Sequence, residues 1–115
     1  MVVQKTTVLS VAKEKQEGDK TPSIDKLVDY IHLKESTYGK QNYSKCKAIG
    51  KFNEYGLGIP GNGRYICFDT REDNKKAVEE WIKKRLSEGL DERTLLCYYN
   101  SGVKTNNCNY IKNYE

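Results

Sequence analysis

The sequence predicts a small, mainly helical domain with a glycine-rich, partly β segment in its middle. The 115 residues allow one compact domain. Apolar residues recur at helical spacing in three separate stretches, which predicts three helices. Between the first and second stretches, residues 39–63 contain six glycines and lack that spacing. This segment is expected to be a long loop.

The composition indicates a domain stabilised by aromatic side chains and cross-links. Leu, Ile, Val and Phe make up only 24 of the 115 residues, close to the range in which chains do not bury a core. Nine Tyr and one Trp supply further apolar bulk, and four Cys can form disulfides. We therefore expect a folded domain. Apolar runs of two or three residues exclude a membrane-spanning helix.

Residues 1–23 are expected to be a polar tail or linker, with the domain occupying residues 24–115. Charged residues are spread through this N-terminal part, so no secretory signal is visible. Only Val8, Leu9 and Val11 form an apolar patch, which can pair as a short strand.

The first predicted helix begins after Ser23, a residue type that caps helices, and runs to about Lys34. Its apolar stripe consists of Ile24, Leu27, Val28 and Ile31. Glu35 takes the next position on the same stripe. A carboxyl group on a core-facing stripe is desolvated, which raises its pKa, and the negative end of the helix dipole acts in the same direction.

Two further helices follow the loop. Residues 43–47 can form a short helix and residues 64–68 a short strand. Thr70, with Asp73 three residues later, predicts a helix start. That helix ends near Gly89, and its apolar face consists of Ala77, Val78, Trp81, Ile82 and Leu86, so Trp81 is expected in the core.

The last predicted helix begins at Asp91, which can cap it, and stops at Gly102. It carries Leu95, Leu96, Cys97 and Tyr99. The tail that follows is rich in Asn and Tyr, and it is anchored if Cys108 is bonded.

The four cysteines favour two disulfides and an oxidising compartment, because the chain is short and poor in core residues. Of the three possible pairings, we favour Cys46–Cys67 with Cys97–Cys108, since each closes one local loop. The alternative is four buried free thiols in a cytosolic protein. The cysteine spacing does not match a zinc site, and His32 is the only histidine, so we expect no metal and no other cofactor.

The net charge of +4 is too small to indicate a nucleic-acid partner. Basic and acidic residues are interleaved along nearly the whole chain. Mild basicity fits attraction to an anionic surface such as a bacterial wall, although most small basic domains have no such role.

Three short segments carry the sequence's only family signal. Glu35-Ser36 closes the first helix, Gly56-Leu57 lies in the glycine-rich loop, and Tyr99-Asn100-Ser101-Gly102 ends the last helix. In this order they resemble the lysozyme-like superfamily, most of all the soluble lytic transglycosylases, over about residues 24–112. The chain departs from that family at Gly58-Ile59, where Met-Gln is usual, and at Ser101, where Ala is commoner.

The resemblance implies a lysozyme-like α+β fold and cleavage of peptidoglycan glycan strands at the β-1,4 bond between N-acetylmuramic acid and N-acetylglucosamine. Glu35 would first protonate the leaving oxygen. As a base it would then help the sugar's own C6 hydroxyl attack, which gives an anhydro product without a second carboxylate. The expected partner is therefore peptidoglycan, and the expected location is outside the cytoplasm. We expect a monomer.

The resemblance also implies roles for other residues. Tyr99 would hydrogen-bond the acid, while Asn100 and Gly102 would shape the adjacent turn. The backbone of residues 56–59, which includes Gly56, Leu57 and Gly58, would line the cleft, and Ser36 would brace the helix end or touch the sugar. Aromatic rings stack on sugars, so four tyrosines are candidate subsite residues: Tyr38, Tyr55, Tyr65 and Tyr98.

Three alternatives remain open. A muramidase would need a second carboxylate to activate water, for which Glu54 and Asp69 are the candidates. A non-catalytic, disulfide-stapled module could bind glycan or protein instead. A cytosolic regulatory domain with free thiols is the third.

Overall fold

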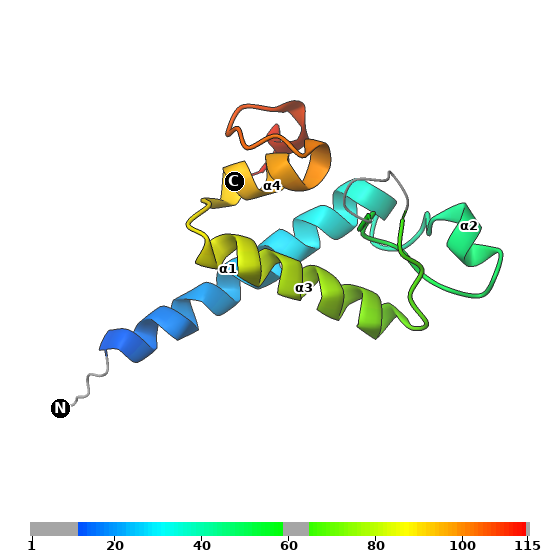
Figure 1. Cartoon of the computed structure of the whole chain (residues 1–115), viewed down its shortest axis with the longest axis horizontal. Helices are drawn as coiled ribbons and strands as arrows, with labels where there is room; N and C mark the ends of the chain where they lie inside the picture. Colours follow the sequence, from blue (N-terminus) through cyan, green and yellow to red (C-terminus); the bar gives the residue numbers. More distant parts are fainter. Residues whose placement is uncertain (1–11, 59–64, 115) are drawn as a thin grey trace.

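A computed structural model describes residues 12–58 and 65–114, with side chains from residue 23 onward. It is mainly helical, as predicted (Figure 1). The elements in chain order are α1 (Ala12–Ser36), α2 (Ser44–Lys47), α3 (Arg71–Ser87), α4 (Glu92–Ser101) and the short 3-10 helix η2 (Asn109–Ile111). The predicted apolar patch around Val8 and the positions of Ile59, Pro60 and Arg64 lie outside the described residues.

Helix α1 begins eleven residues before the start predicted at Ser23, so that prediction was wrong. Residues 12–20 have no apolar periodicity, but they are rich in Ala, Lys, Glu and Gln, which favour helix. The helix also continues through Pro22, which lacks a backbone N–H for the helical ladder. The buried stripe nevertheless starts at Ile24, as expected.

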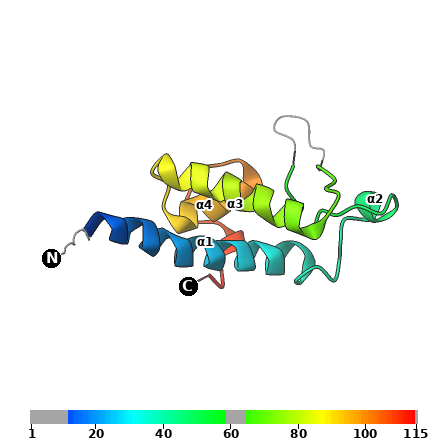
Figure 2. The same ribbon diagram turned by 90° about the horizontal axis from the view of Figure 1, so that it is seen from below.

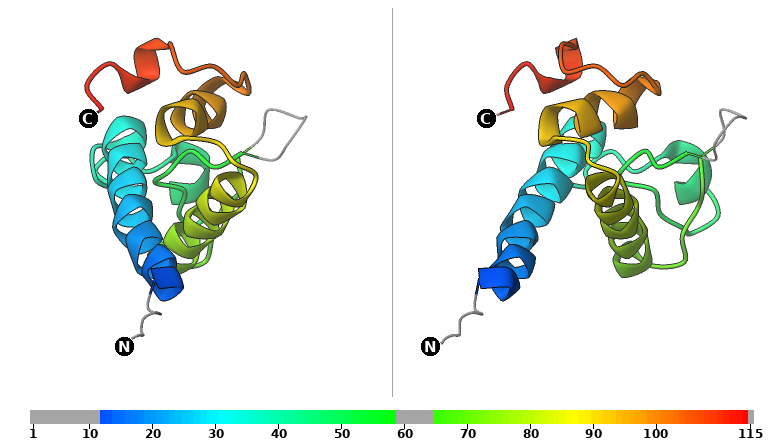
Figure 3. Two further views of the ribbon diagram at one scale, coloured as in Figure 1. Left: turned by 90° about the vertical axis from the view of Figure 1, so that its left-hand side faces the viewer. Right: turned by 60° about the vertical axis from the view of Figure 1, so that its left-hand side comes forward.

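The core lies where α1, α3 and α4 meet. In both views of Figure 3, α4 and the C-terminal segment lie above α1 and α3. Figure 2 shows α3 and α4 along one side of α1. The predicted stripe on α1 is buried, and so are the apolar residues that face it: Val78, Ile82, Leu95, Leu96 and Ile111.

Both predicted helix starts after the loop are confirmed. The side chain of Thr70 accepts a hydrogen bond from the Asp73 amide at 3.0 Å, and α3 follows it. Asp91 accepts one from the Thr94 amide at 2.8 Å and starts α4. Helix α4 ends at Gly102, whose φ of 78° is left-handed. These caps depend on residues within three positions of one another, which is why the sequence predicts them.

The middle segment contains two isolated antiparallel bridges, Phe52–Phe68 and Gly58–Tyr65, and no strand among its described residues. The strand predicted over residues 64–68 is therefore wrong. The short helix predicted over 43–47 is confirmed as α2.

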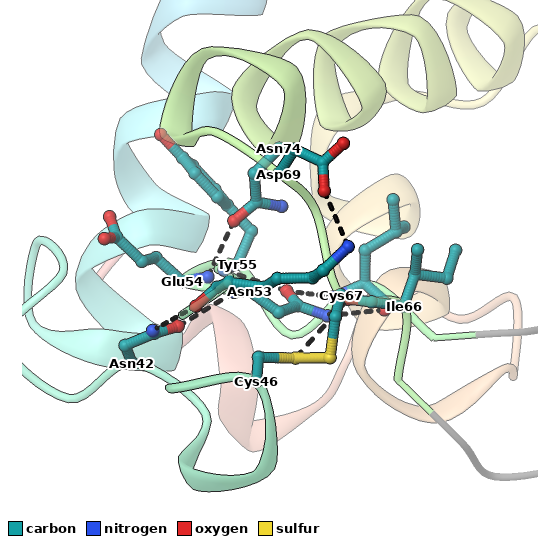
Figure 4. Close-up of a disulfide and its surroundings, with 11 residues drawn as sticks. Asn42, Cys46, Asn53, Glu54, Tyr55, Ile66, Cys67, Asp69 and Asn74 are labelled. Carbon is teal, nitrogen blue, oxygen red and sulfur yellow. Dashed lines mark hydrogen bonds and ion pairs between the residues drawn. A yellow bond between two sulfur atoms is a disulfide. The ribbon is translucent and has the colours of Figure 1, made fainter. Parts of the chain in front are cut away.

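The buried Asn53 side chain organises this loop in place of a strand ladder (Figure 4). Its Nδ2 donates to the carbonyls of Leu57 and Ile66, at 2.9 and 2.8 Å. Its Oδ1 accepts from the amides of Tyr55 and Leu57. One amide side chain thus satisfies backbone groups from both sides of the loop.

Two disulfides join Cys46 to Cys67 and Cys97 to Cys108, which confirms the predicted pairing. The first closes the middle loop (Figure 4), and the second ties the C-terminal segment to α4. In the chain-entropy model each is worth about 3 kcal/mol. None of the helices in the described part of the chain has the length and apolar character needed to cross a membrane.

We expect Ile31→Ala to lower the free energy of unfolding by about 3 kcal/mol, because the Ile31 side chain is fully buried where α1 meets the other helices. Leu33→Ala is the matched control on the same helix. Leu33 is 40% exposed, so its removal should change the free energy by less than about 1 kcal/mol. Urea denaturation of both variants measures the difference, and equal losses would contradict the packing of α1 described above.

Candidate functional site

Glu35 lies in the last turn of α1, where the chain reverses sharply. Thr37, Tyr38 and Gly39 all have positive φ, at 53°, 58° and 88°. Ser36 is buried, and its Oγ accepts from the Gly39 amide at 2.8 Å and donates to the His32 carbonyl. Of the two roles expected for Ser36, these contacts fit bracing of the helix end, since the side chain does not reach the surface.

The Glu35 side chain is half-buried and lies directly against Gly56 of the middle loop. A Cβ at Gly56 would overlap the Glu35 carboxyl, so that carboxyl would have to move to admit any other residue. The φ of Gly56 is also positive, at 69°. Two independent requirements therefore explain the glycine here: a backbone conformation that favours it, and a carboxyl group in the place of a side chain.

Tyr110 holds the other Glu35 oxygen. Its hydroxyl donates to Glu35 Oε2 at 2.8 Å. No sequence motif marks this residue, because it lies 75 positions away in a tail without a recognised motif. The available signal was Cys108, two residues earlier, whose disulfide to Cys97 fixes the tail beside α4. The Tyr30 hydroxyl also donates to the Tyr110 carbonyl, at 2.5 Å.

Burial raises the pKa of the Glu35 carboxyl above its ordinary value of 4.5. The Tyr110 hydrogen bond and the positive charge of Lys34 oppose this shift, since both favour the carboxylate, but burial outweighs them. The direction predicted from the apolar stripe therefore holds. Glu35 keeps its proton to a higher pH than an exposed glutamate does.

Tyr99 does not hydrogen-bond Glu35 as the resemblance implied. Its hydroxyl donates instead to the backbone carbonyl of Tyr55, at 2.5 Å, and Tyr110 occupies the expected role. The Tyr55 ring is buried and stacks on His32 with centroids 4.3 Å apart, so this ring is not a sugar platform. Tyr99 and Tyr55 together fix the loop on which Gly56 lies.

An open groove of about 320 Å³ lies beside this loop. One wall consists of the loop residues Gly56, Leu57 and Gly58, as the resemblance implied. The other walls come from α3 and the end of α4, namely Trp81, Arg85, Tyr98, Tyr99 and Gly102. Gly56 thus lines the groove and also lies against the Glu35 carboxyl, which is not itself among the residues that line the groove.

Trp81 is partly buried and packs against the core, as predicted in part, and it also lines the groove, which was not predicted. Its ring is roughly parallel to that of Tyr98, with centroids 5.9 Å apart, and perpendicular to that of Tyr99 at 5.0 Å. The guanidinium of Arg85 lies 5.0 Å from the Trp81 ring centroid. The groove therefore has an aromatic wall with a cation at its edge.

The other candidate residues are placed as follows. Tyr98 lines the groove. Asn100 is exposed on the last turn of α4 and is not among the residues that line it. Tyr38 and Tyr65 are exposed and are not among the residues that line the groove. Tyr65 is bridged to Gly58, which does line it, and packs edge-on against Tyr43.

Glu54 is buried, and each of its carboxylate oxygens has a hydrogen-bonding partner. His32 Nε2 lies 2.9 Å from one oxygen, and Arg71 Nε lies 2.5 Å from the other. Burial disfavours the Glu54 carboxylate, but the hydrogen bonds from Arg71 and His32 outweigh that effect and hold its pKa below 4.5. Asp69 is exposed and pairs with Lys51 at 2.6 Å. Both carboxylates are in ion pairs, whereas the half-buried Glu35 accepts a hydrogen bond from a neutral hydroxyl.

Within residues 23–58 and 65–114, no group of three or more His, Cys, Asp or Glu side chains could hold a metal ion. Comparison of the chain with family models, curated proteins and solved structures gave no match. The function must therefore be argued from the residues and their geometry.

We expect Gly56→Ala to destabilise the protein by about 1–3 kcal/mol more than Gly50→Ala does. Both glycines have positive φ, 69° and 74°, so both variants carry a conformational penalty of about 1–2 kcal/mol. Only at Gly56 does the new methyl group collide with the Glu35 carboxyl, since nothing lies within 4 Å of a Cβ at Gly50. Chemical denaturation measures both, and equal penalties would contradict the Gly56–Glu35 contact.

Proposed function

We propose that this protein is a lytic transglycosylase that cleaves peptidoglycan glycan strands between N-acetylmuramic acid and N-acetylglucosamine. One observation carries the proposal: Glu35 is half-buried, with a raised pKa, and packs against a glycine that also lines an aromatic groove. The order of the segments around Glu35, Gly56 and Tyr99, which resembles that family, supports the same function.

The environment of Glu35 suits a general acid that then becomes a base. Protonated Glu35 would donate its proton to the oxygen of the glycosidic bond as that bond breaks. The resulting carboxylate would take the proton from the C6 hydroxyl of the same N-acetylmuramic acid as that oxygen bonds to C1. The Tyr110 hydroxyl favours the carboxylate formed in the first step, because it donates to Glu35 Oε2.

The groove suits a saccharide. Trp81 and Tyr98 offer aromatic surface for sugar rings, and the loop wall at Gly56 and Gly58 has no side chains in the way. Because these glycines expose their backbone, peptide groups there can pair with N-acetyl substituents. The groove is open to solvent, as a polymer substrate requires.

Anhydro-forming cleavage is favoured over hydrolysis because the carboxylates of Glu54 and Asp69 are already in ion pairs. A muramidase needs a second carboxylate that holds a water. Both oxygens of Glu54 are occupied by His32 and Arg71, and Asp69 is exposed and paired with Lys51. Using the substrate's own hydroxyl as nucleophile removes the need for either residue.

We propose that the protein works outside the cytoplasm, as its substrate requires. The two disulfides are compatible with an oxidising compartment, and all four cysteines are used in them. This arrangement does not favour the cytosolic domain with free thiols.

Glu35→Gln should lower the rate of peptidoglycan digestion about 100-fold or more, because an amide cannot supply the proton. Glu72→Gln, at an exposed carboxyl on α3, is the matched control and should keep full activity. Mass spectrometry of the wild-type digest should show anhydro ends. Reducing ends would indicate a muramidase, and equal activity of Glu35→Gln and wild type would support the non-catalytic binding module.

Tyr110→Phe should move the alkaline limb of the pH–activity profile to higher pH. Activity needs protonated Glu35, so it declines as pH rises through the pKa of that carboxyl. The Tyr110 hydrogen bond lowers this pKa, and removing the hydroxyl therefore raises it further. A limb that stays in place, or moves to lower pH, would contradict the proposed role of Tyr110.

A further inference from the structure

The net positive charge of the chain comes from one segment. Residues 36–53 contain four lysines and no acidic residue. The other 16 basic residues are balanced by the 16 acidic ones, so this segment accounts for the whole net charge of +4. The expectation that basic and acidic residues are interleaved nearly everywhere therefore fails over these 18 positions. The four lysines are Lys40, Lys45, Lys47 and Lys51.

This segment forms a projection that we call the α2 lobe, residues 40–51. Figures 1 and 2 show α2 standing away from the bundle of α1, α3 and α4, beyond the end of α1. The disulfide Cys46–Cys67 joins the lobe to the rest of the middle loop. The Asn42 side chain donates to the Lys51 carbonyl at 3.0 Å, which closes the lobe at its base. The lobe is thus held in a fixed shape.

Three of its lysines carry uncompensated charge. Lys51 pairs with Asp69. Lys40, Lys45 and Lys47 are exposed, and no residue of the described chain forms an ion pair with any of them. Three like charges on one small projection repel one another slightly and attract any extended anionic surface.

The tip of the lobe is apolar. Ile49 is 62% exposed, the largest exposed fraction among the exposed large apolar side chains of the described residues. Its neighbours Ala48 and Gly50 are exposed too, and Lys47 and Lys51 flank the three. Leaving an isoleucine in water is unfavourable, and transferring it to an apolar phase is favourable. An exposed apolar side chain flanked by lysines can enter the headgroup boundary of a membrane while the lysines contact the lipid phosphates.

We propose that the α2 lobe binds the surface of an anionic lipid bilayer, with its lysines at the headgroup phosphates and Ile49 in the acyl boundary. The charge alone would also suit a soluble phosphate polymer. The exposed Ile49 favours the bilayer, because a polymer of phosphates offers an isoleucine no apolar phase. Binding of this kind would hold a wall-cleaving domain beside the membrane without a spanning helix, and it does not depend on Glu35.

The test is co-sedimentation of the oxidised full chain with lipid vesicles. We expect binding to vesicles that mix phosphatidylglycerol with phosphatidylcholine, and none to vesicles of phosphatidylcholine alone. Neutralising Lys40, Lys45 and Lys47 to Gln should weaken binding about 100-fold. The matched control neutralises three exposed lysines of α3 to Gln, namely Lys75, Lys76 and Lys84, and should change binding by less than about threefold.

A second variant separates the apolar tip from the charge. Ile49→Asn keeps every lysine and should weaken vesicle binding about fivefold or more. Glu35→Gln should bind vesicles like the wild type, so that vesicle binding and lytic activity can fail independently. Near-ultraviolet circular dichroism checks that each variant keeps its fold, as expected for exposed positions.

Four results would overturn the proposal. One is no binding of the wild type to the anionic vesicles. Another is equal weakening by the α2-lobe and α3 triple variants, which would make total charge the cause. The third is unchanged binding of Ile49→Asn. The last is binding to polyphosphate in solution but not to vesicles, which would assign the lobe to a phosphate polymer.

Discussion

The structure of the site depends on a carboxyl group occupying the space that a side chain at Gly56 would fill. Glu35 lies in the last turn of α1 and Gly56 lies in the middle loop, which forms one wall of the groove, so this contact joins α1 to that wall. It also removes Glu35 from water enough to raise its pKa. The fold and the proposed chemistry therefore rest on the same close approach.

A second contact of the same kind lies nearby and has the opposite electrostatic result. A Cβ at Gly39 would stand 2.5 Å from Glu54 Oε1, so this carboxyl also packs against a glycine. Glu54, however, meets His32 and Arg71, which hold it ionised, whereas Glu35 meets only a neutral hydroxyl and the charge of Lys34. The pKa values of the two glutamates are thus shifted in opposite directions because their neighbours differ. Glu54 suits a structural anchor, and Glu35 suits a general acid.

The C-terminal segment completes the site from outside the three motifs. Cys97–Cys108 ties this segment to α4, and Tyr110 then reaches Glu35. The disulfide and the acid are therefore linked through one tyrosine. This arrangement explains how a chain with few aliphatic residues keeps a distant hydroxyl in place: a covalent bond substitutes for a larger core.

The sequence by itself determined the features that depend on neighbouring residues. These are the caps at Thr70 and Asp91, the buried stripe of α1, the end of α4 and the local disulfide pairing. Only the tertiary structure decided that Tyr110 rather than Tyr99 holds Glu35, and that Trp81 lines a groove. Such facts depend on where distant segments meet, which periodicity and capping do not encode. The early start of α1 was missed for a different reason, since its first turns are helical by propensity without an apolar face.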